Sequence, residues 1–250
     1  MDLFTFCANQ GPLQEKPDLV HAIFSQVCAG LATLHNRDIL HGDVKTENVL
    51  VLKAAAGRPF FCLSDLGSAH NVKAPDTFKE HGHTTAFAAP EVVCAVRSLI
   101  GKKADVFSLG CMLTDVLVAQ PLFNPTASLE RHLALVQRLN LHKPFPAAVR
   151  SARHLFDRDG YVRGWLPANI RLQQPWYEQN PHEKSFRPFL PFIRRCCLPS
   201  PRSRPSLREL VAFTVGLTMG KQLVSSAPPS PEPQPRPQHY SSPTKMRYSR

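Results

Sequence analysis

Three polar residues stand between two apolar runs in the stretch ILHGDVKTENVLV, residues 39–51. Asp43, Lys45 and Asn48 occur at fixed offsets where a chain forming only a strand would keep apolar side chains. Asp and Asn both suit turns, so a turn explains any one of these residues but not the set. A carboxylate, an ammonium and a carboxamide presented by one loop suit magnesium-assisted phosphoryl transfer. That chemistry is the first hypothesis for this stretch.

The composition is that of a globular chain, with 43% hydrophobic residues in a length of 250 that suits one large domain or two small ones. Thirty Lys and Arg against nineteen Asp and Glu give a net charge of +11. Such a charge suits nucleic acid, an anionic membrane or phosphate-bearing partners. The basic residues are spread out, and we interpret 193–197 and 201–205 as solvated surface. Nucleic acid is therefore not favoured as a partner.

Cysteine usage and the N-terminal sequence bear on the cellular compartment. The seven cysteines lack paired C-x-x-C spacing, which argues against a zinc site and against a secreted disulfide framework. The opening MDLFTFCANQ lacks the basic and apolar regions of a signal peptide, and no run of about 18 apolar residues occurs in the sequence. We therefore predict an intracellular protein, cytoplasmic or nuclear, that makes no membrane contact.

The elements that must position the polar loop follow from the hydrophobic pattern. Helical spacing predicts a helix over 17–36, directly before the loop. Extended segments are predicted over 39–52 and 59–69, with a turn at 53–58. The almost wholly apolar stretch 104–123 predicts a buried central helix. Further helices are predicted at 127–140, 186–197 and 205–219.

The C-terminal residues differ in composition from the rest of the chain. Residues 223–250 are dense in Pro and Ser and nearly free of aliphatic side chains. Such a segment cannot bury enough apolar surface to offset its chain entropy. We predict one folded domain over 1–222 and a disordered, basic Pro/Ser-rich tail over 223–250. A tail of this kind suits the aromatic-lined groove of an SH3- or WW-type partner.

Four separated motifs resemble the C-terminal lobe of eukaryotic-type serine/threonine protein kinases, in that family's order. HGDVKTEN resembles the catalytic loop H-R-D-x-K-x-x-N, and SDLGSA resembles the D-F-G magnesium motif. TTAFAAPE resembles the end of the activation segment, and ADVFSLG resembles the D-x-W-S-x-G start of the large central helix. The resemblance covers roughly residues 1–222. It implies an α+β, mostly α fold: a helical lobe with a small β element that carries the catalytic and magnesium loops.

The resemblance implies a chemical role for each residue of the polar loop. Asp43 would accept the proton of the substrate hydroxyl, and Lys45 would steady the transferring phosphoryl group. Asn48 and Asp65 would hold the magnesium ions that bridge the phosphates of ATP. ATP and Mg²⁺ are therefore the implied cofactors. The implied reaction is transfer of the γ-phosphoryl group to Ser or Thr of protein substrates.

Other positions matching the family are expected to support this site. Glu91 should form a bidentate ion pair with Arg204. Asp105 should bind the backbone of the catalytic loop, and His41 should pack behind the Asp-Leu-Gly turn. Thr84 should contact the catalytic Asp and Lys at the substrate groove. All five residues are expected to be structural rather than chemical.

Glu47, one residue before the magnesium-binding Asn48, has two open interpretations. In kinases that prefer basic substrates, a Glu at the matching position faces the substrate groove and receives an Arg that precedes the phosphorylated hydroxyl. The alternative is a solvated loop residue. The first interpretation predicts substrates with basic residues before the Ser or Thr.

The sequence departs from the family pattern in several places. Gly42 replaces the Arg that receives an activation-loop phosphate, so we do not expect control by that phosphate. Leu66 and Phe107 replace Phe and Trp of the family motifs and should still pack. No G-x-G-x-x-G loop precedes a Lys-bearing strand, and residues 1–15 match the segment just beyond the hinge. We therefore expect this chain to lack the N-terminal lobe.

Two function classes and two subgroups stay open. The chain is either a part of an active serine/threonine kinase or a non-catalytic, pseudokinase-like interaction module. The string HGDVKTENVLV resembles herpesvirus-encoded kinases, where K-T-E-N is familiar, and the kinase that induces NF-κB, where H-G-D-V-K occurs. The divergent helical region after Phe123 favours the viral subgroup.

Overall fold

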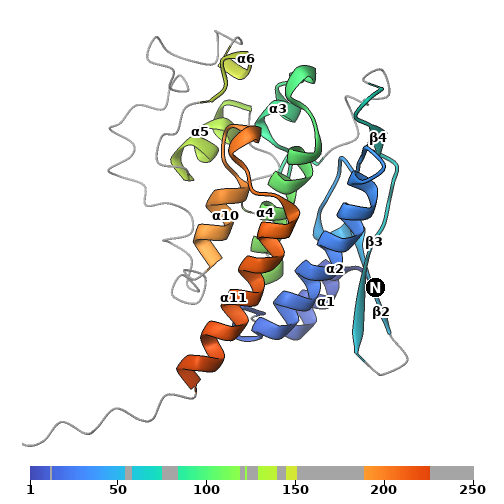
Figure 1. The fold of residues 1–250 in the computed structure, drawn as a ribbon, viewed down its shortest axis with the longest axis vertical. Coiled ribbons are helices and arrows are strands. Elements are labelled where there is room, and N and C mark those ends of the chain that lie inside the picture. Colours follow the sequence, from blue (N-terminus) through green and yellow to red (C-terminus); the bar gives the residue numbers. More distant parts are fainter. Residues whose placement is uncertain are drawn as a thin grey trace, which may run out of the picture.

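The computed structural model describes residues 1–11, 13–53, 58–74, 84–118, 122, 129–139, 145–150 and 189–225. This part of the chain is rich in helix and has few strands, which confirms the prediction of a mostly helical α+β fold. Figure 1 shows helices α2, α4 and α11 running through the centre, with the strands at one side. Among these described residues, none of the helices has the length and apolar character needed to cross a bilayer.

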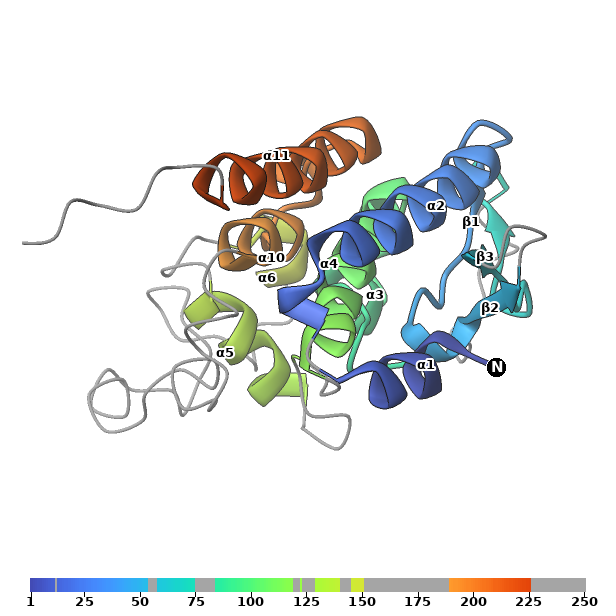
Figure 2. The ribbon, with the colours of Figure 1, turned by 90° about the horizontal axis from the view of Figure 1, so that it is seen from below.

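Helix α2 (Pro17–His35) confirms the helix predicted directly before the polar loop. Pro17 occupies its first turn, where the missing N–H costs nothing. The apolar side chains of α2 face the core, and α11 (Leu207–Ser225) lies alongside it in both views (Figures 1 and 2). His21 of α2 and Thr214 of α11 are joined by a hydrogen bond of 2.9 Å between Nδ1 and Oγ1. The two helices thus pack against each other.

Helix α4 (Lys102–Val118) is the buried central helix that the sequence predicts. Leu122 lies in a bend outside the helix, so the predicted C-terminal end at Phe123 was too late. Gly110 allows a close contact with α10 (Leu190–Cys196), because a Cβ there would lie 2.4 Å from the Cys196 Cβ. Phe192 of α10 packs edge-on against Phe24 of α2, with ring centroids 5.4 Å apart.

The strands form two antiparallel pairs within the described residues. The pair β2 (Val49–Lys53) and β3 (Pro59–Leu63) confirms part of the extended segments predicted over 39–52 and 59–69, and Lys53, predicted in the turn, belongs to β2. Four other residues of the predicted turn, 54–57, lie outside the described part. The pair β1 (Ile39–Leu40) and β4 (His70–Asn71) joins the two ends of the region that holds the motifs. Both pairs therefore bring the loop after β1 close to the segment after β3.

Helix α1 (Leu3–Gln10) is an element that the sequence did not predict. Asp2 caps it by accepting a 2.7 Å hydrogen bond from the Thr5 N–H. Leu3 and Cys7 are buried, and α1 packs against α4. An eight-residue helix is marginal on its own, so burial rather than local propensity stabilises it.

The remaining helices are short or lie near undescribed residues. Helix α5 (Leu129–Leu139) matches the prediction for 127–140. Helix α11 continues through Ser225, past the predicted domain end at 222, while 226–250 lie outside the described residues. Two further helices of one turn are α3 (Pro90–Val93) and α6 (Ala147–Arg150). Residues 186–188 of the helix predicted over 186–197 also lie outside the described part.

Candidate active site

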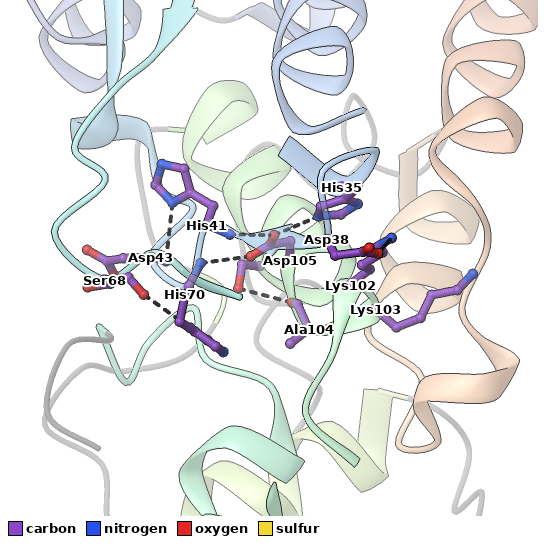
Figure 3. A network of polar contacts seen from close by, with 12 residues as sticks. His35, Asp38, His41, Asp43, Ser68, His70, Lys102, Lys103, Ala104 and Asp105 are labelled. Atoms are coloured by element: carbon purple, nitrogen blue, oxygen red, sulfur yellow. Dashed lines mark hydrogen bonds and ion pairs between the residues drawn. The ribbon is translucent and has the colours of Figure 1, made fainter. Parts of the chain in front are cut away.

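The candidate catalytic loop, residues 41–48, connects β1 to β2, and hydrogen bonds to helix α4 hold it in place. The Asp105 carboxylate is buried and accepts hydrogen bonds of 3.0 Å from the backbone N–H groups of His41 and Gly42. It also accepts a 2.8 Å bond from Nε2 of His35. Figure 3 shows Asp105 between the His35 ring and the loop backbone. The contact to the loop backbone is the one expected from the sequence, and His35 is a residue that the sequence reasoning missed.

Three groups converge on the Asp43 carboxylate. Lys45 Nζ lies 2.8 Å from Oδ2, Asn48 Nδ2 donates to the same oxygen at 2.9 Å, and the Thr84 N–H donates to Oδ1 at 2.9 Å. Lys45 also donates to the Thr84 hydroxyl at 2.7 Å. Burial raises the pKa of Asp43, but the bonds from Lys45 and Thr84 outweigh it and lower the pKa below its usual value. Asp43 is therefore an ionised carboxylate at neutral pH.

Asn48 and Asp65, the expected magnesium ligands, are brought together by the β2–β3 pair. Ser64 donates from its backbone and from its hydroxyl to the Asn48 carbonyl, at 2.8 and 2.9 Å, which places Asp65 one residue away. Asn48 Nδ2 donates to the carbonyl and carboxylate of Asp43, so its amide oxygen remains as an acceptor. Asp65 is exposed. Carboxylate and amide oxygens are ligands that Mg²⁺ accepts, so the residues present fit this ion.

The Asp65 backbone adopts an unusual conformation. Its φ of +59° lies in the left-handed region, which Asp tolerates better than most residues. This conformation accompanies a tight turn in which Asp65 Oδ1 accepts a 3.0 Å bond from the Gly67 N–H. Left-handed residues of this kind concentrate at functional sites. The turn therefore orients the carboxylate that the sequence assigned to metal binding.

His41 links the catalytic loop to the segment before Asp65. Its Nε2 lies 2.9 Å from the Ser64 carbonyl, and its Nδ1 lies 3.3 Å from the Asp43 N–H. A carbonyl can only accept and an N–H can only donate, so both bonds require the tautomer with the proton on Nε2. His41 is completely buried. It thus fixes the distance between the two loops, as its expected position behind the Asp-Leu-Gly turn suggested.

A close backbone contact explains why position 42 is a glycine, beyond the absence of the family's Arg there. Its φ is +84°, and a Cβ at this position would lie 2.7 Å from the Ser68 carbonyl oxygen. The segment after Asp65 therefore packs directly on the backbone of the catalytic loop, where only glycine fits. Sequence reasoning saw a missing guanidinium here and missed the close contact with Ser68.

A second carboxylate ties the start of the loop to the segment after β4. Asp38 forms ion pairs with Lys73 at 2.5 Å and with Lys102 at 2.8 Å. Hydrogen bonds from Lys102 and Lys73 lower the pKa of Asp38 to about 2. The Val72 N–H also donates to the Asp38 carbonyl at 2.8 Å. These contacts, with the β1–β4 pair, hold residues 70–73 against the chain that enters the catalytic loop.

Glu91 and Arg204 form a bidentate ion pair, as expected from the sequence. The two Nη atoms lie 2.5 and 2.7 Å from the two carboxylate oxygens, and both side chains are fully buried. The guanidinium also lies over the Phe107 ring, 5.0 Å from its centroid. Its other hydrogens go to three backbone carbonyls, those of Leu198, Pro199 and Lys103. Every N–H of this arginine is therefore paired.

Glu47 is exposed and points its Oε2 toward the Thr46 hydroxyl at 3.2 Å. The same hydroxyl lies 2.9 Å from Oδ2 of Asp115, a buried residue of α4. Sequence reasoning did not single out Asp115. The available signal was a carboxylate in an otherwise apolar helix, which must find a partner when it is buried.

Comparison with known families agrees with this geometry. The model of the family described as "Protein kinase domain" matches residues 1–214. The chain belongs to this family. Among its relatives, cyclin-dependent kinase-like 2 of Oryctolagus cuniculus is 26% identical over 196 residues, which are 77% of this chain and 32% of that protein. Cell division control protein 7 of Schizosaccharomyces pombe is 28% identical over 192 residues, which are 74% of this chain and 17% of that protein.

A third relative is more similar over a comparable stretch. Serine/threonine-protein kinase ppk6 of S. pombe is 34% identical over 183 residues, which are 71% of this chain and 21% of that protein. This kinase-domain chain thus spans about a third or less of the length of these three curated relatives. The match to the family model over residues 1–214 is what shows family membership.

Proposed function

We propose that this chain is the C-terminal lobe of a protein serine/threonine kinase, which transfers the γ-phosphoryl group of ATP to Ser or Thr of protein substrates. The observation that carries the proposal is the convergence of Lys45, Asn48 and Thr84 on the Asp43 carboxylate, each within 2.9 Å. A lobe used only for binding has no need to keep a carboxylate, an ammonium and a carboxamide in this arrangement.

Each residue has a role that its surroundings support. Asp43, ionised at neutral pH, accepts the proton of the substrate hydroxyl, and Thr84 holds the carboxylate in place. Lys45 lies between Asp43 and Thr84, where its charge stabilises a transferring phosphoryl group. Asn48 and Asp65 would hold Mg²⁺, which neutralises phosphate charge when it is bound with ATP.

The proposal includes a covering lobe from outside residues 1–250. An apolar surface beside the site supports this part. Leu50 and Leu52 of β2 and Phe60 of β3 are 41, 47 and 47% exposed, and Leu52 pairs with Phe60 across the strands. Exposed apolar side chains grouped on one surface favour a site of interaction. The same surface supports the alternative function, a non-catalytic module that docks a partner protein.

Other parts of the proposal rest on the sequence. They are a domain over 1–222, a disordered tail over 223–250 that binds an SH3- or WW-type partner, an intracellular location, and substrates with basic residues before the Ser or Thr. The resemblance to herpesvirus-encoded kinases and to the kinase that induces NF-κB also stays a prediction. Nothing in the comparisons named above supports a viral origin.

The test is transfer from radiolabelled ATP to a generic basic protein, with Asp43→Asn as the matched variant. We expect residues 1–250 alone to bind ATP–Mg²⁺ weakly, to lose that binding in Asp65→Asn, and to transfer nothing measurable. Joined to a covering lobe, the chain should transfer phosphate only when Asp43 is intact. Asp43-dependent transfer by residues 1–250 alone would refute the claim that the site needs a covering lobe. Transfer that survives Asp43→Asn would refute the catalytic role.

A further inference from the structure

Two carboxylates compete for one hydrogen atom beside the candidate active site. The Thr46 hydroxyl lies 2.9 Å from Asp115 Oδ2 and 3.2 Å from Glu47 Oε2. A hydroxyl carries a single hydrogen, and an ionised carboxylate can only accept. If both carboxylates are ionised, only one of the two contacts can be a hydrogen bond at any moment.

A proton on Asp115 satisfies both contacts at once. The protonated carboxyl donates to the Thr46 oxygen, and the Thr46 hydroxyl then donates to Glu47. The surroundings of Asp115 favour this state, because the residue is only 2% exposed and its Oδ1 has no hydrogen-bond partner among the described residues. An unpaired buried carbonyl oxygen is far less costly than an unpaired buried carboxylate oxygen.

The charged and titratable groups around Asp115 point the same way. Of the elements packed against α4 at this position, α1 contributes Cys7, and the short 3₁₀ helix η2 (Thr46–Asn48) contributes Glu47. Cys111 lies one turn earlier on α4 itself. Burial raises the pKa of both thiols, so they are neutral at physiological pH. Within the described part of the chain, no cation shifts the pKa of Asp115 downward.

The pKa of Asp115 is raised to about 7, first because burial penalises the carboxylate. The bond from Thr46 opposes this rise, and the charge of Glu47 adds to it. Gain and loss of the proton therefore both occur near physiological pH, where a small change in conditions shifts the balance.

We propose that Asp115 and Glu47 share one hydrogen-bond chain through the Thr46 hydroxyl, so that a proton on Asp115 holds the Glu47 carboxylate and loss of that proton releases it. When Asp115 is ionised, the Thr46 hydrogen turns to it, and Glu47 is free to take a cation from solvent or from a substrate. Asp115 is thus a positioning residue that acts on Glu47 from the buried side of the loop. Use of Glu47 in substrate recognition rests on the proposed function, whereas the hydrogen-bond chain does not.

The test follows the carboxyl carbons of Asp and Glu by ¹³C NMR in residues 1–250 without nucleotide or metal, between pH 4 and pH 9. The Asp115 signal is assigned by its loss in Asp115→Asn, and the Glu47 signal by its loss in Glu47→Gln. We expect Asp115 to titrate near neutrality and the Glu47 signal to shift at the same pH. Asp115→Asn, whose amide mimics the protonated carboxyl, should remove that shift from Glu47.

Two further variants should shift the titration midpoint of Asp115 in opposite directions. Glu47→Gln should lower the titration midpoint of Asp115, because a neighbouring negative charge is removed. Thr46→Val should raise it, because the carboxylate loses its donor, and should also uncouple the two signals. Asp18→Asn, an exposed Asp on α2, is the matched control and should change neither signal.

Two results would overturn the inference. One is titration of Asp115 in the ordinary range for Asp, and the other is a neutral-range shift of the Glu47 signal that persists in Asp115→Asn. These results are independent of phosphoryl transfer. A chain that shows the coupled titration but never phosphorylates a substrate would refute the proposed function and leave the hydrogen-bond chain standing.

Discussion

Removal of the Arg204 side chain should destabilise this fold more than removal of any exposed arginine. In Arg204→Ala, the fully buried carboxylate of Glu91 loses both of its charged donors. Breaking a buried pair by deleting one partner costs about 3 to 5 kcal/mol, because the remaining charge stays buried. Three backbone carbonyls also lose a donor. We therefore expect a loss of at least about 3 kcal/mol.

This loss is large compared with the whole stability of a domain, which is about 5 to 15 kcal/mol. For a chain of this size, about 3 kcal/mol corresponds to a fall in Tm of about 6 to 12 °C. Arg202 is the matched control, since it lies two residues away and is exposed. Arg202→Ala should change Tm by no more than about 2 °C, as surface substitutions generally do.

Two additional variants separate the ion pair from the volume of the side chain. Arg204→Lys keeps the charge but loses the planar fork, so its Tm should fall between those of the wild type and Arg204→Ala. The double variant Glu91→Ala, Arg204→Ala should be less destabilised than the sum of the single changes, because no lone charge stays buried. Equal melting temperatures for Arg202→Ala and Arg204→Ala would refute the reasoning.

Three other predictions concern the catalytic loop. Gly42→Ala should lower stability by at least about 1 to 2 kcal/mol in urea melts, because Gly42 has a left-handed φ and a Cβ there would meet the Ser68 carbonyl. Gly101→Ala is the control and should not lower stability, because there is open space around Gly101. Equal effects of the two changes would contradict this prediction. The pKa of Asp115 is about 7 in the folded chain and 3.8 ordinarily, so its contribution to stability is lost as pH rises from about 4 to 7. Between pH 5 and pH 8 the free energy of unfolding of the wild type should therefore fall by about 2 to 3 kcal/mol more than that of Asp115→Asn. Parallel curves of stability against pH would contradict this prediction. If the proposed function holds, Glu47→Gln in an active kinase that contains this chain should weaken a preference for Arg before the Ser or Thr in peptide arrays by about 1.5 to 3 kcal/mol. An unchanged preference would leave Glu47 a surface residue.

The sequence predicted those features that are local or that follow motif spacing. The helix over 17–36 and the central helix carry their own hydrophobic patterns, so their presence could be read without tertiary information. The contacts of Asp43, Glu91 and Asp105 join residues far apart in the chain. Only the resemblance to a known family made them predictable, because no local pattern encodes a partner 41 to 113 residues away.

The features that were missed depend on tertiary contacts without a motif. Helix α1 depends on the burial of Leu3 and Cys7, and its eight residues alone do not predict a helix. The partner of Asp115 is Thr46, 69 residues earlier, and a Thr within a catalytic loop carries no signal of its own. Gly42 was read through the family pattern as a lost Arg, and its contact with Ser68 appears only when the chain is folded.

Helix α4 sets the geometry of the candidate active site from beneath. Asp105 near its start binds the backbone at His41 and Gly42, and Asp115 binds the hydroxyl of Thr46. The two carboxylates are ten residues apart, which on an α-helix is about 15 Å along the axis. One rigid, buried helix therefore fixes both ends of the loop that presents Asp43 and Lys45.

The two anchors on α4 differ in chemistry, and this difference has a functional consequence. Asp105 accepts three hydrogen bonds, so it is satisfied as a carboxylate and holds its end of the loop permanently. Among the described residues, Asp115 has only the Thr46 hydroxyl as a hydrogen-bond partner, and the direction of that bond reverses with the Asp115 proton. Both ends of the loop are thus held in either state, while the Glu47 side chain is held or released according to the Asp115 proton. Under the proposed function, proton uptake at Asp115 alters the recognition of substrate cations by Glu47 and leaves the Asp43 carboxylate undisturbed.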